Sequence, residues 1–359
     1  MTDRSSEYAT RFLLFGGLIL GGFLAFFAAR ILLVPFVAAL FLVYVFEPAV
    51  IQLRRKHLSA STAFVLLLAV TVLGVGTFLT FIPSWLSVDD PGEFRSVIAA
   101  SPEGADSEFT ARLETQLREV EQWIKDRLPV VASFDIAGEV TNRGTSFVVR
   151  FFNGLPSVVG SLMINLLLVP LIAYFMVRDG RKLRRRLVGM VPNRYFEMSL
   201  MMMHQVDTQV GGYFRSRFIE SILVGLSMLV AMGVLAIWVP QPFILLIAVI
   251  IGLTNLIPYI GPVMGLAFGA LLYLGLGFPV SSIVGLAAGV GIAQLLDNVV
   301  FAPIVLSQNV DLHPLTVILV LLIGGEILGV LGLLIAVPVA ASVKIISAEL
   351  YRNYSLQVR

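Results

Sequence analysis

The chain has 359 residues, of which 58% are hydrophobic and 13% are charged, and its formal net charge is +2. Soluble domains have roughly 45–50% apolar and about 25% charged residues, so this chain has too few polar side chains to cover a water-facing globule. The absence of cysteine excludes disulfides, thiolate metal sites and cysteine nucleophiles. We therefore expect a protein of the lipid bilayer, with no metal, no cofactor and no nucleic-acid partner.

Continuous apolar segments predict membrane-spanning helices. They cover 12–29, 31–46, 62–86, 147–177, 217–239, 243–257, 262–276, 280–306 and 314–346. Barrel strands alternate apolar and polar residues over about ten positions, whereas these runs are unbroken. The first run exceeds the roughly 7–15 residues of a signal-peptide core, so we expect a retained span. The pattern predicts an all-α, polytopic integral membrane protein of about eight transmembrane helices.

Two polar stretches differ in charge and predict the orientation. The stretch 87–146 contains twelve acidic and six basic residues, whereas 178–194 contains seven basic residues and a single acidic one. Short basic loops stay in the cytoplasm. We therefore expect the N-terminus and 178–194 to be cytoplasmic and 87–146 to be extracytoplasmic, in the inner (cytoplasmic) membrane. Apolar residues at helical spacing predict an amphipathic helix over 109–128.

The expected organisation has five parts. They are N-terminal transmembrane helices (1–86), an extracytoplasmic polar segment (87–146), a long transmembrane helix (147–177), a cytoplasmic basic loop and helix (178–216) and a C-terminal transmembrane transport region (217–350). In the last part, 243–257 and 262–276 are only about 15 residues, or ~22 Å of helix, against a hydrocarbon core of ~30 Å. They predict a re-entrant pair, with further broken helices towards the C-terminus. The exact number of crossings and the side of the C-terminus stay open.

Three acidic residues, Glu220, Asp297 and Glu326, lie inside apolar runs. A charge at mid-membrane costs at least ~2.5 kcal/mol, so such residues usually face a cavity or a partner. On a helix, Gln294, Asp297 and Asn298 share one face, and this polar stripe is a candidate transport path. The alternative is a structural hydrogen-bond cluster between helices.

Two irregular segments are candidate hinges or gates. Pro258, Gly261 and Pro262 exclude a regular helix just after Asn255, which is a further candidate residue of the transport path. Broken backbone at membrane depth must be buried or line water, so this segment predicts a hairpin tip beside the transport path, and the alternative is a surface loop.

The second irregular segment precedes Glu326. Gly324 and Gly325 predict a helix break whose free carbonyls, with Glu326, form a cation or proton site. The alternative is a buried acid that pairs with a basic residue of another helix. Arg215 and Arg217 lie just before an apolar run, and we expect both at the membrane interface.

No sequence motif of a P-loop, a zinc protease or a serine hydrolase occurs, so we expect neither an enzyme nor ATP-driven transport within this chain. Several other segments resemble the autoinducer-2 exporter family. They are Tyr174–Asp179, Val191-Pro192, Tyr213–Arg217, Leu256–Pro262, Gln294–Pro303, Leu312–Leu315 and Gly324–Pro338. The family often has Gly and Gln where Ser216 and Arg217 stand here. The resemblance implies a transporter, linked in some members to autoinducer-2 export and in others to sodium or lithium/proton antiport. It also implies a homo-oligomer, such as a pentamer.

Three hypotheses follow. The first is an ion-coupled secondary transporter that exports a small polar solute, driven by H⁺ or Na⁺, with carboxylates from Asp297 and Glu326 and a gate at 258–262. The second is a Na⁺(Li⁺)/H⁺ antiporter, because a buried carboxylate that binds H⁺ and Na⁺ in turn needs little else. The third is a non-transporting membrane scaffold that binds a partner through 87–146.

Overall fold

The computed structural model describes residues 33–85, 114–118, 121, 122, 125, 138, 165, 167–186, 188–258, 260–305 and 312–357. All regular elements within these ranges are helices, so the predicted all-α class is confirmed. The predicted span at 12–29, most of the polar segment 87–146 and the first half of the predicted helix 147–177 lie outside the described residues.

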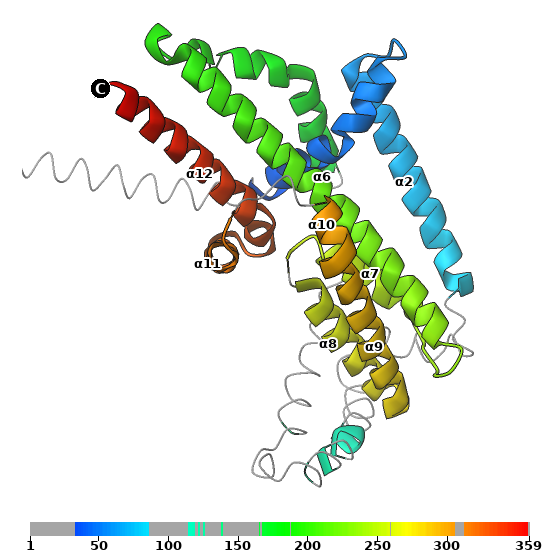
Figure 1. Ribbon diagram of the computed structural model, residues 1–359. Coiled ribbons are helices and arrows are strands. Elements are labelled where there is room, and N and C mark those ends of the chain that lie inside the picture. The colour runs from blue at the N-terminus through cyan, green and yellow to red at the C-terminus, as the bar shows by residue number, and fades with distance from the viewer. Residues whose placement is uncertain are drawn as a thin grey trace, which may run out of the picture. The chain divides into compact units, whose positions relative to one another are not determined.

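Four described helices are long and apolar enough to cross a bilayer (Figure 1). They are Leu33–Arg54, α6 (Phe196–Leu235), Val280–Val305 and the first part of α12 (Val330–Gln357). Shorter apolar helices are the first part of α2 (Ala60–Trp85), α7 (Ile244–Thr254), α8 (Ile260–Gly275) and α11 (Pro314–Leu328). Large apolar side chains such as Leu73, Leu226 and Val263 are more than half exposed, as suits a surface that faces lipid. The chain is a polytopic membrane protein, as predicted.

The chain divides into two compact units. Unit 1 comprises the described residues up to Leu67, those between 164 and Met203, and those from Leu312 onward. Unit 2 comprises the described residues between Leu68 and 163 and those between His204 and 311. In unit 1, the helix Leu33–Arg54, the start of α2 and the helical residues 167–186 share an apolar core that contains Ala39, Val50, Ala63, Phe64 and Ala173.

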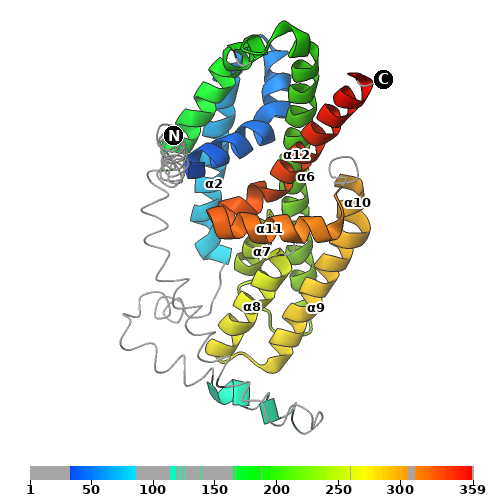
Figure 2. The same cartoon turned by 90° about the vertical axis from the view of Figure 1, so that its left-hand side faces the viewer.

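In unit 1, α11 and α12 form a helical hairpin (Figure 2). α11 continues through Gly324 and Gly325 to Leu328, and the chain turns at Gly329, whose φ of 63° suits glycine. The helix break predicted at Gly324–Gly325 is therefore wrong, and the break comes at Gly329. Gly324 instead permits a close helix crossing, because a Cβ there would lie 2.6 Å from the carbonyl oxygen of Gly332 in α12.

Prolines mark the starts of several helices. Pro314 begins α11, and the ring nitrogen Nδ1 of His313 accepts a hydrogen bond of 3.3 Å from the N–H of Leu315. Pro279 precedes α9 (Val280–Leu296), and Pro262 lies in the first turn of α8. The first four N–H groups of a helix have no partner within the helix, so proline removes no hydrogen bond at these positions.

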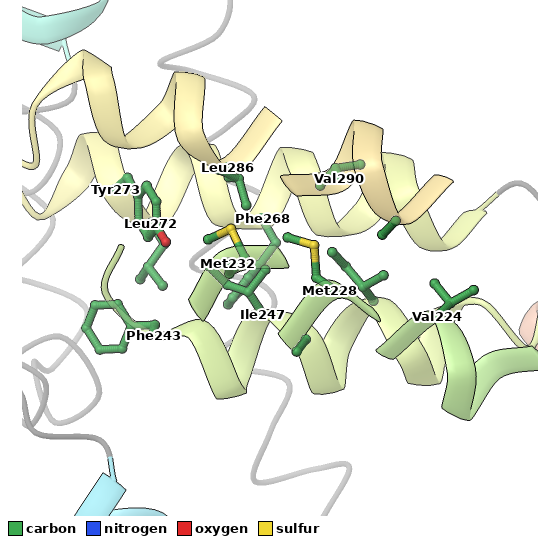
Figure 3. Close-up of a cluster of buried hydrophobic side chains, with 13 residues drawn as sticks. Val224, Met228, Met232, Phe243, Ile247, Phe268, Leu272, Tyr273, Leu286 and Val290 are labelled. Atoms are coloured by element: carbon green, nitrogen blue, oxygen red, sulfur yellow. The ribbon is translucent and has the colours of Figure 1, made fainter. Parts of the chain in front are cut away.

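Unit 2 is built on α6, α7, α8 and α9, which surround an apolar core. Figure 3 shows Met228 and Met232 of α6 among Ile247 of α7, Phe268 of α8 and Leu286 of α9. All five side chains are almost completely buried. Glycines bring these helices together: a Cβ on Gly269 of α8, for example, would lie 2.7 Å from a methyl group of Leu286.

The short pair α7 and α8 matches the two short helices predicted at 243–257 and 262–276. They contain 11 and 16 residues. Their lengths of about 16 and 24 Å fall short of a hydrocarbon core of ~30 Å. They pack against each other in unit 2, and the turn between them follows Asn255. This arrangement is a helical hairpin of two arms.

Candidate functional site

α6 contains 40 residues and is about 60 Å long, twice the thickness of the hydrocarbon core. One face of this helix is buried along much of its length. That face is apolar towards the C-terminal end, where it joins the core of unit 2. Nearer the N-terminal end of α6, the same face carries buried polar side chains at helical spacing: Tyr213, Ser216, Arg217, Glu220 and Ser221. The buried face of α6 is therefore polar in its first part and apolar in its second part.

Arg217 and Glu220 form a buried ion pair on this face. Nη1 of Arg217 lies 2.6 Å from Oε2 of Glu220, and the two side chains are 9% and 2% exposed. Arg217 therefore faces the interior of unit 2, and its place at the membrane interface stays a prediction. A buried guanidinium is stable only beside an opposite charge, and the spacing of three residues supplies one from the same helix.

Asp297 opens a π-helical turn, Asp297–Phe301, between α9 and α10 (Ala302–Val305). The N–H of Ala302 donates to the carbonyl of Asp297, five residues earlier. Pro303 accounts for the wide turn. In a regular α-helix its ring would clash with the carbonyl four residues earlier, and proline has no N–H to donate. The π turn relieves this clash and gives Asp297 its buried position.

The carboxyl groups of Glu220 and Asp297 meet between α6 and the π turn. The two carboxyl groups interact electrostatically, and Asp297 is 6% exposed. Two like charges repel each other at short range, so a proton on one of the two groups stabilises the pair. When the pair holds one proton, the two carboxyl groups carry one negative charge, which the guanidinium of Arg217 balances. The three side chains together are then neutral, as a low-dielectric interior favours.

The hairpin of α7 and α8 closes a further side of the site. α7 runs antiparallel to α6, because Gly252 accepts a hydrogen bond from the Ser221 hydroxyl while Ala248, one turn earlier, lies beside Gly225. This register places Asn255, one turn beyond Gly252, at the level of the ion pair. Asn255 is the C-cap of α7 and is 3% exposed.

The turn after Asn255 packs directly on it. A Cβ on Gly261 would lie 2.9 Å from both Cα and Cβ of Asn255, so only glycine fits at this position. Pro258 is buried and Pro262 is half-buried within α8. The three predicted hinge residues thus lie beside a predicted site residue.

Several buried polar atoms of this region have no aligned hydrogen bond among the described residues. They are Oη of Tyr213, Nε of Arg217, Nδ2 of Asn255 and Oδ1 of Asp297, whereas Oε2 of Glu220 contacts Nη1 of Arg217 at 2.6 Å. Buried polar atoms in proteins are nearly always satisfied. Four such atoms in one region mark a place where water or a solute can bind. We call Tyr213, Arg217, Glu220, Asn255 and Asp297 the Arg217 cluster.

The other predicted residues lie elsewhere. Nε2 of Gln294 donates to Oδ1 of Asn298 over 3.1 Å on the exposed side of the helix, whereas Asp297 is buried. The predicted stripe of three residues is therefore split between two faces. Glu326 belongs to unit 1, on the exposed face of α11, as part of the same helix as Gly324 and Gly325.

Arg217 and Tyr213 are missing from the residues that the sequence predicts for the site. A signal for both is present, however. Tyr213, Arg217 and Glu220 follow one another at spacings of four and three, so they share a helix face. An acidic residue inside an apolar run usually pairs with a basic residue on the same helix face. This pattern indicates that Arg217 faces inward with Glu220.

A second polar cluster lies at the other end of the core. Figure 3 shows Tyr273 and Phe243 at one end and Val224 at the other. Oη of Tyr273 donates to the carbonyl of Pro242 over 2.7 Å, and it lies 3.4 Å from Oε1 of Gln241. Nε2 of Gln241 donates to the carbonyl of Ser282 over 3.2 Å. We call Gln241, Tyr273 and Ser282 the Gln241 cluster.

Comparison with known proteins places this chain in a family. The model of the AI-2E family transporter matches residues 14–352. The chain belongs to the AI-2E transporter family. It is 28% identical over 344 residues to "Putative permease PerM" of Escherichia coli K12, and the match covers 91% of this chain and 90% of that protein. The family resemblance expected from the sequence is confirmed.

Two further relatives match a shorter stretch. The chain is 29% identical over 204 residues to "Putative transport protein YueF" of Bacillus subtilis, a match that covers 56% of this chain and 53% of YueF. It is 27% identical over 184 residues to "Putative transport protein YrrI" of the same organism, covering 51% of this chain and 50% of YrrI. The chain thus spans about half the length of these two relatives. Membership of the AI-2E family supports a role in membrane transport.

Proposed function

We propose that this AI-2E family protein is a secondary transporter that exports a small polar solute, such as an autoinducer-2-like signal, coupled to an ion gradient. The Arg217 cluster is the proposed site. The observation that carries the proposal is the burial of three ionisable side chains between helices, with polar atoms left unsatisfied. Buried charges are expensive. A cluster that only joined helices would use neutral groups, as the Gln241 cluster does.

The two neighbouring carboxyl groups support coupling to H⁺. Glu220 and Asp297 interact with each other, and together their carboxyl groups can hold no proton, one or two. Each change of one proton alters the charge of a buried site by one and so alters which conformation is favoured. A polar solute would accept a hydrogen bond from Asn255 and donate one to Asp297, at the atoms left unsatisfied there.

The proposed orientation follows from charge. The helical residues 167–186 end in a basic stretch whose side chains are exposed, and short basic segments stay in the cytoplasm. The N-terminal part of α6, which follows this stretch, would then extend into the cytoplasm, because 40 residues exceed the thickness of a bilayer. We propose the cytoplasmic membrane as the location.

The test is solute flux in proteoliposomes that contain a pH-sensitive dye. We expect Glu220→Gln and Asp297→Asn each to reduce proton-coupled flux about tenfold or more, because each removes a carboxyl of the pair. Gln294→Ala is the matched control, because Gln294 lies three residues before Asp297 but pairs with Asn298 on the exposed side. Wild-type flux in both carboxyl variants would show that the Arg217 cluster is not the transport site.

The other hypotheses give different results in the same vesicles. A Na⁺(Li⁺)/H⁺ antiporter would change internal pH on addition of sodium without any solute. A scaffold would transport nothing, and its function in cells would be lost on deletion of 100–140 and kept in Asp297→Asn.

A further inference from the structure

We propose that Arg217 is a built-in cation that takes the place of a coupling metal ion, so that the exchangeable cation of this site is the proton and neither Na⁺ nor Li⁺. The inference rests on the proposed function only for the use of the site in transport. Its claim about cation binding stands on the contacts of the Arg217 cluster.

The first step is the contact that the guanidinium makes. Nη1 of Arg217 lies 2.6 Å from Oε2 of Glu220, at the distance where a cation would bind this carboxyl group. The pair is buried, with the side chains of Arg217 and Glu220 9% and 2% exposed. One of the two carboxyl groups of the site is therefore already occupied by a positive charge.

The second step is the supply of ligands. Hard cations take several oxygen ligands. Two of the unsatisfied atoms, Nε of Arg217 and Nδ2 of Asn255, carry N–H groups, which donate hydrogen bonds and do not ligate a cation. A proton needs no such shell, because it bonds to a single carboxyl oxygen.

The third step is repulsion. A metal ion held between the two carboxyl groups would lie about 4 Å from the guanidinium, and at an effective dielectric constant of about 20 this repulsion weakens binding roughly a thousandfold. A proton is subject to the same charge but forms a covalent bond with one carboxyl oxygen, which offsets that repulsion. In the described part of unit 2, the titratable groups that face this pair are Tyr213 and Arg217 from α6.

Removal of the guanidinium should then allow the site to bind sodium or lithium as well as the proton. In Arg217→Gln, the Glu220 carboxyl group is freed, and the two carboxyl groups carry one negative charge with nothing to balance it. Sodium or lithium can bind there and stabilise the folded protein. Arg217→Lys keeps the positive charge, so we expect it to resemble the wild type.

The experiment is thermal unfolding of the purified full-length protein in detergent, in sodium chloride and in choline chloride of equal ionic strength. We expect no sodium-dependent change of Tm in the wild type or in Arg217→Lys, and a rise of several degrees in Arg217→Gln. The double variant Arg217→Gln, Asp297→Asn should lose that rise. A folded Arg217→Gln variant whose Tm does not change with sodium or lithium would overturn the proposal.

A second measurement covers the case in which Arg217→Gln does not fold. Equilibrium dialysis of the wild type with radioactive sodium should show no binding that depends on Asp297. Binding in the wild type that Asp297→Asn abolishes would overturn the proposal. Absence of flux in the proteoliposomes would refute the proposed function but would leave both binding measurements interpretable.

Discussion

Unit 2 contains two buried polar clusters at opposite ends of one apolar core, and they differ in what their hydrogen bonds reach. In the Gln241 cluster, the neutral side chains of Tyr273 and Gln241 donate to the backbone carbonyls of Pro242 and Ser282, and one atom, Oγ of Ser282, has no partner among the described residues. In the Arg217 cluster, charged side chains contact one another, and four further polar atoms have no aligned partner among the described residues. The two clusters therefore differ above all in charge.

This difference separates a cluster that stabilises the fold from one that can also take part in transport. Backbone carbonyls cannot change their charge, so the Gln241 cluster has a single favourable state. Carboxyl groups can gain or lose a proton, so the Arg217 cluster has more than one charge state. We therefore expect the first cluster to control stability and the second to control transport as well.

The largest expected effect is at Glu220. Glu220→Ala leaves the guanidinium of Arg217 buried with its nearest charge removed, and we expect it to lower the free energy of unfolding by about 3–5 kcal/mol. Tyr273→Phe removes one hydrogen bond from the Gln241 cluster and should cost only about 0.6 kcal/mol. Unfolding by titration with SDS in mixed micelles measures both. A smaller cost for Glu220→Ala than for Tyr273→Phe would remove the distinction between the clusters.

A medium effect is expected where α9 meets Gln241. A Cβ on Gly285 would collide with Nε2 of Gln241, so Gly285→Ala must displace the side chain that bonds to Ser282. We expect a loss of about 1–3 kcal/mol in the free energy of unfolding, with flux unchanged in the protein that folds. In a Gln241→Ala background the added methyl group has room, so the two costs should not add. Strict additivity would show that the collision is absent.

The smallest effect is expected at Ser216, beside the Arg217 cluster. Its hydroxyl donates to the carbonyl of Val305 over 2.8 Å, at the end of α10. Ser216→Ala should lower the free energy of unfolding by about 0.6 kcal/mol, the average for hydrogen bonds between membrane helices. Flux should stay near the wild-type level because the hydroxyl group carries no charge. A tenfold loss of flux in a stable Ser216→Ala variant would extend the site towards α10.

Much of the architecture can be predicted from the sequence because it depends on local composition. The class of membrane protein follows from the share of apolar residues, and the short helices of the α7–α8 hairpin follow from run length and from Pro258 and Pro262. The break near Gly324 was misplaced because glycine has two uses in a membrane helix. It can end the helix, as Gly329 does, or it can permit another helix to approach, as Gly324 does.

Glu220 and Asp297 can be recognised as unusual from the sequence, because an acid in an apolar run is visible in any short window. Which charges meet depends on the tertiary structure. Arg217 turns inward because α6 buries the face that it shares with Glu220, and Asp297 reaches this pair because a π turn before Pro303 shifts its position. Whether a segment enters the membrane depends on its own composition, whereas contacts between side chains of different segments depend on how the helices pack. That packing separates the buried Asp297 from Gln294 and Asn298 on the exposed side.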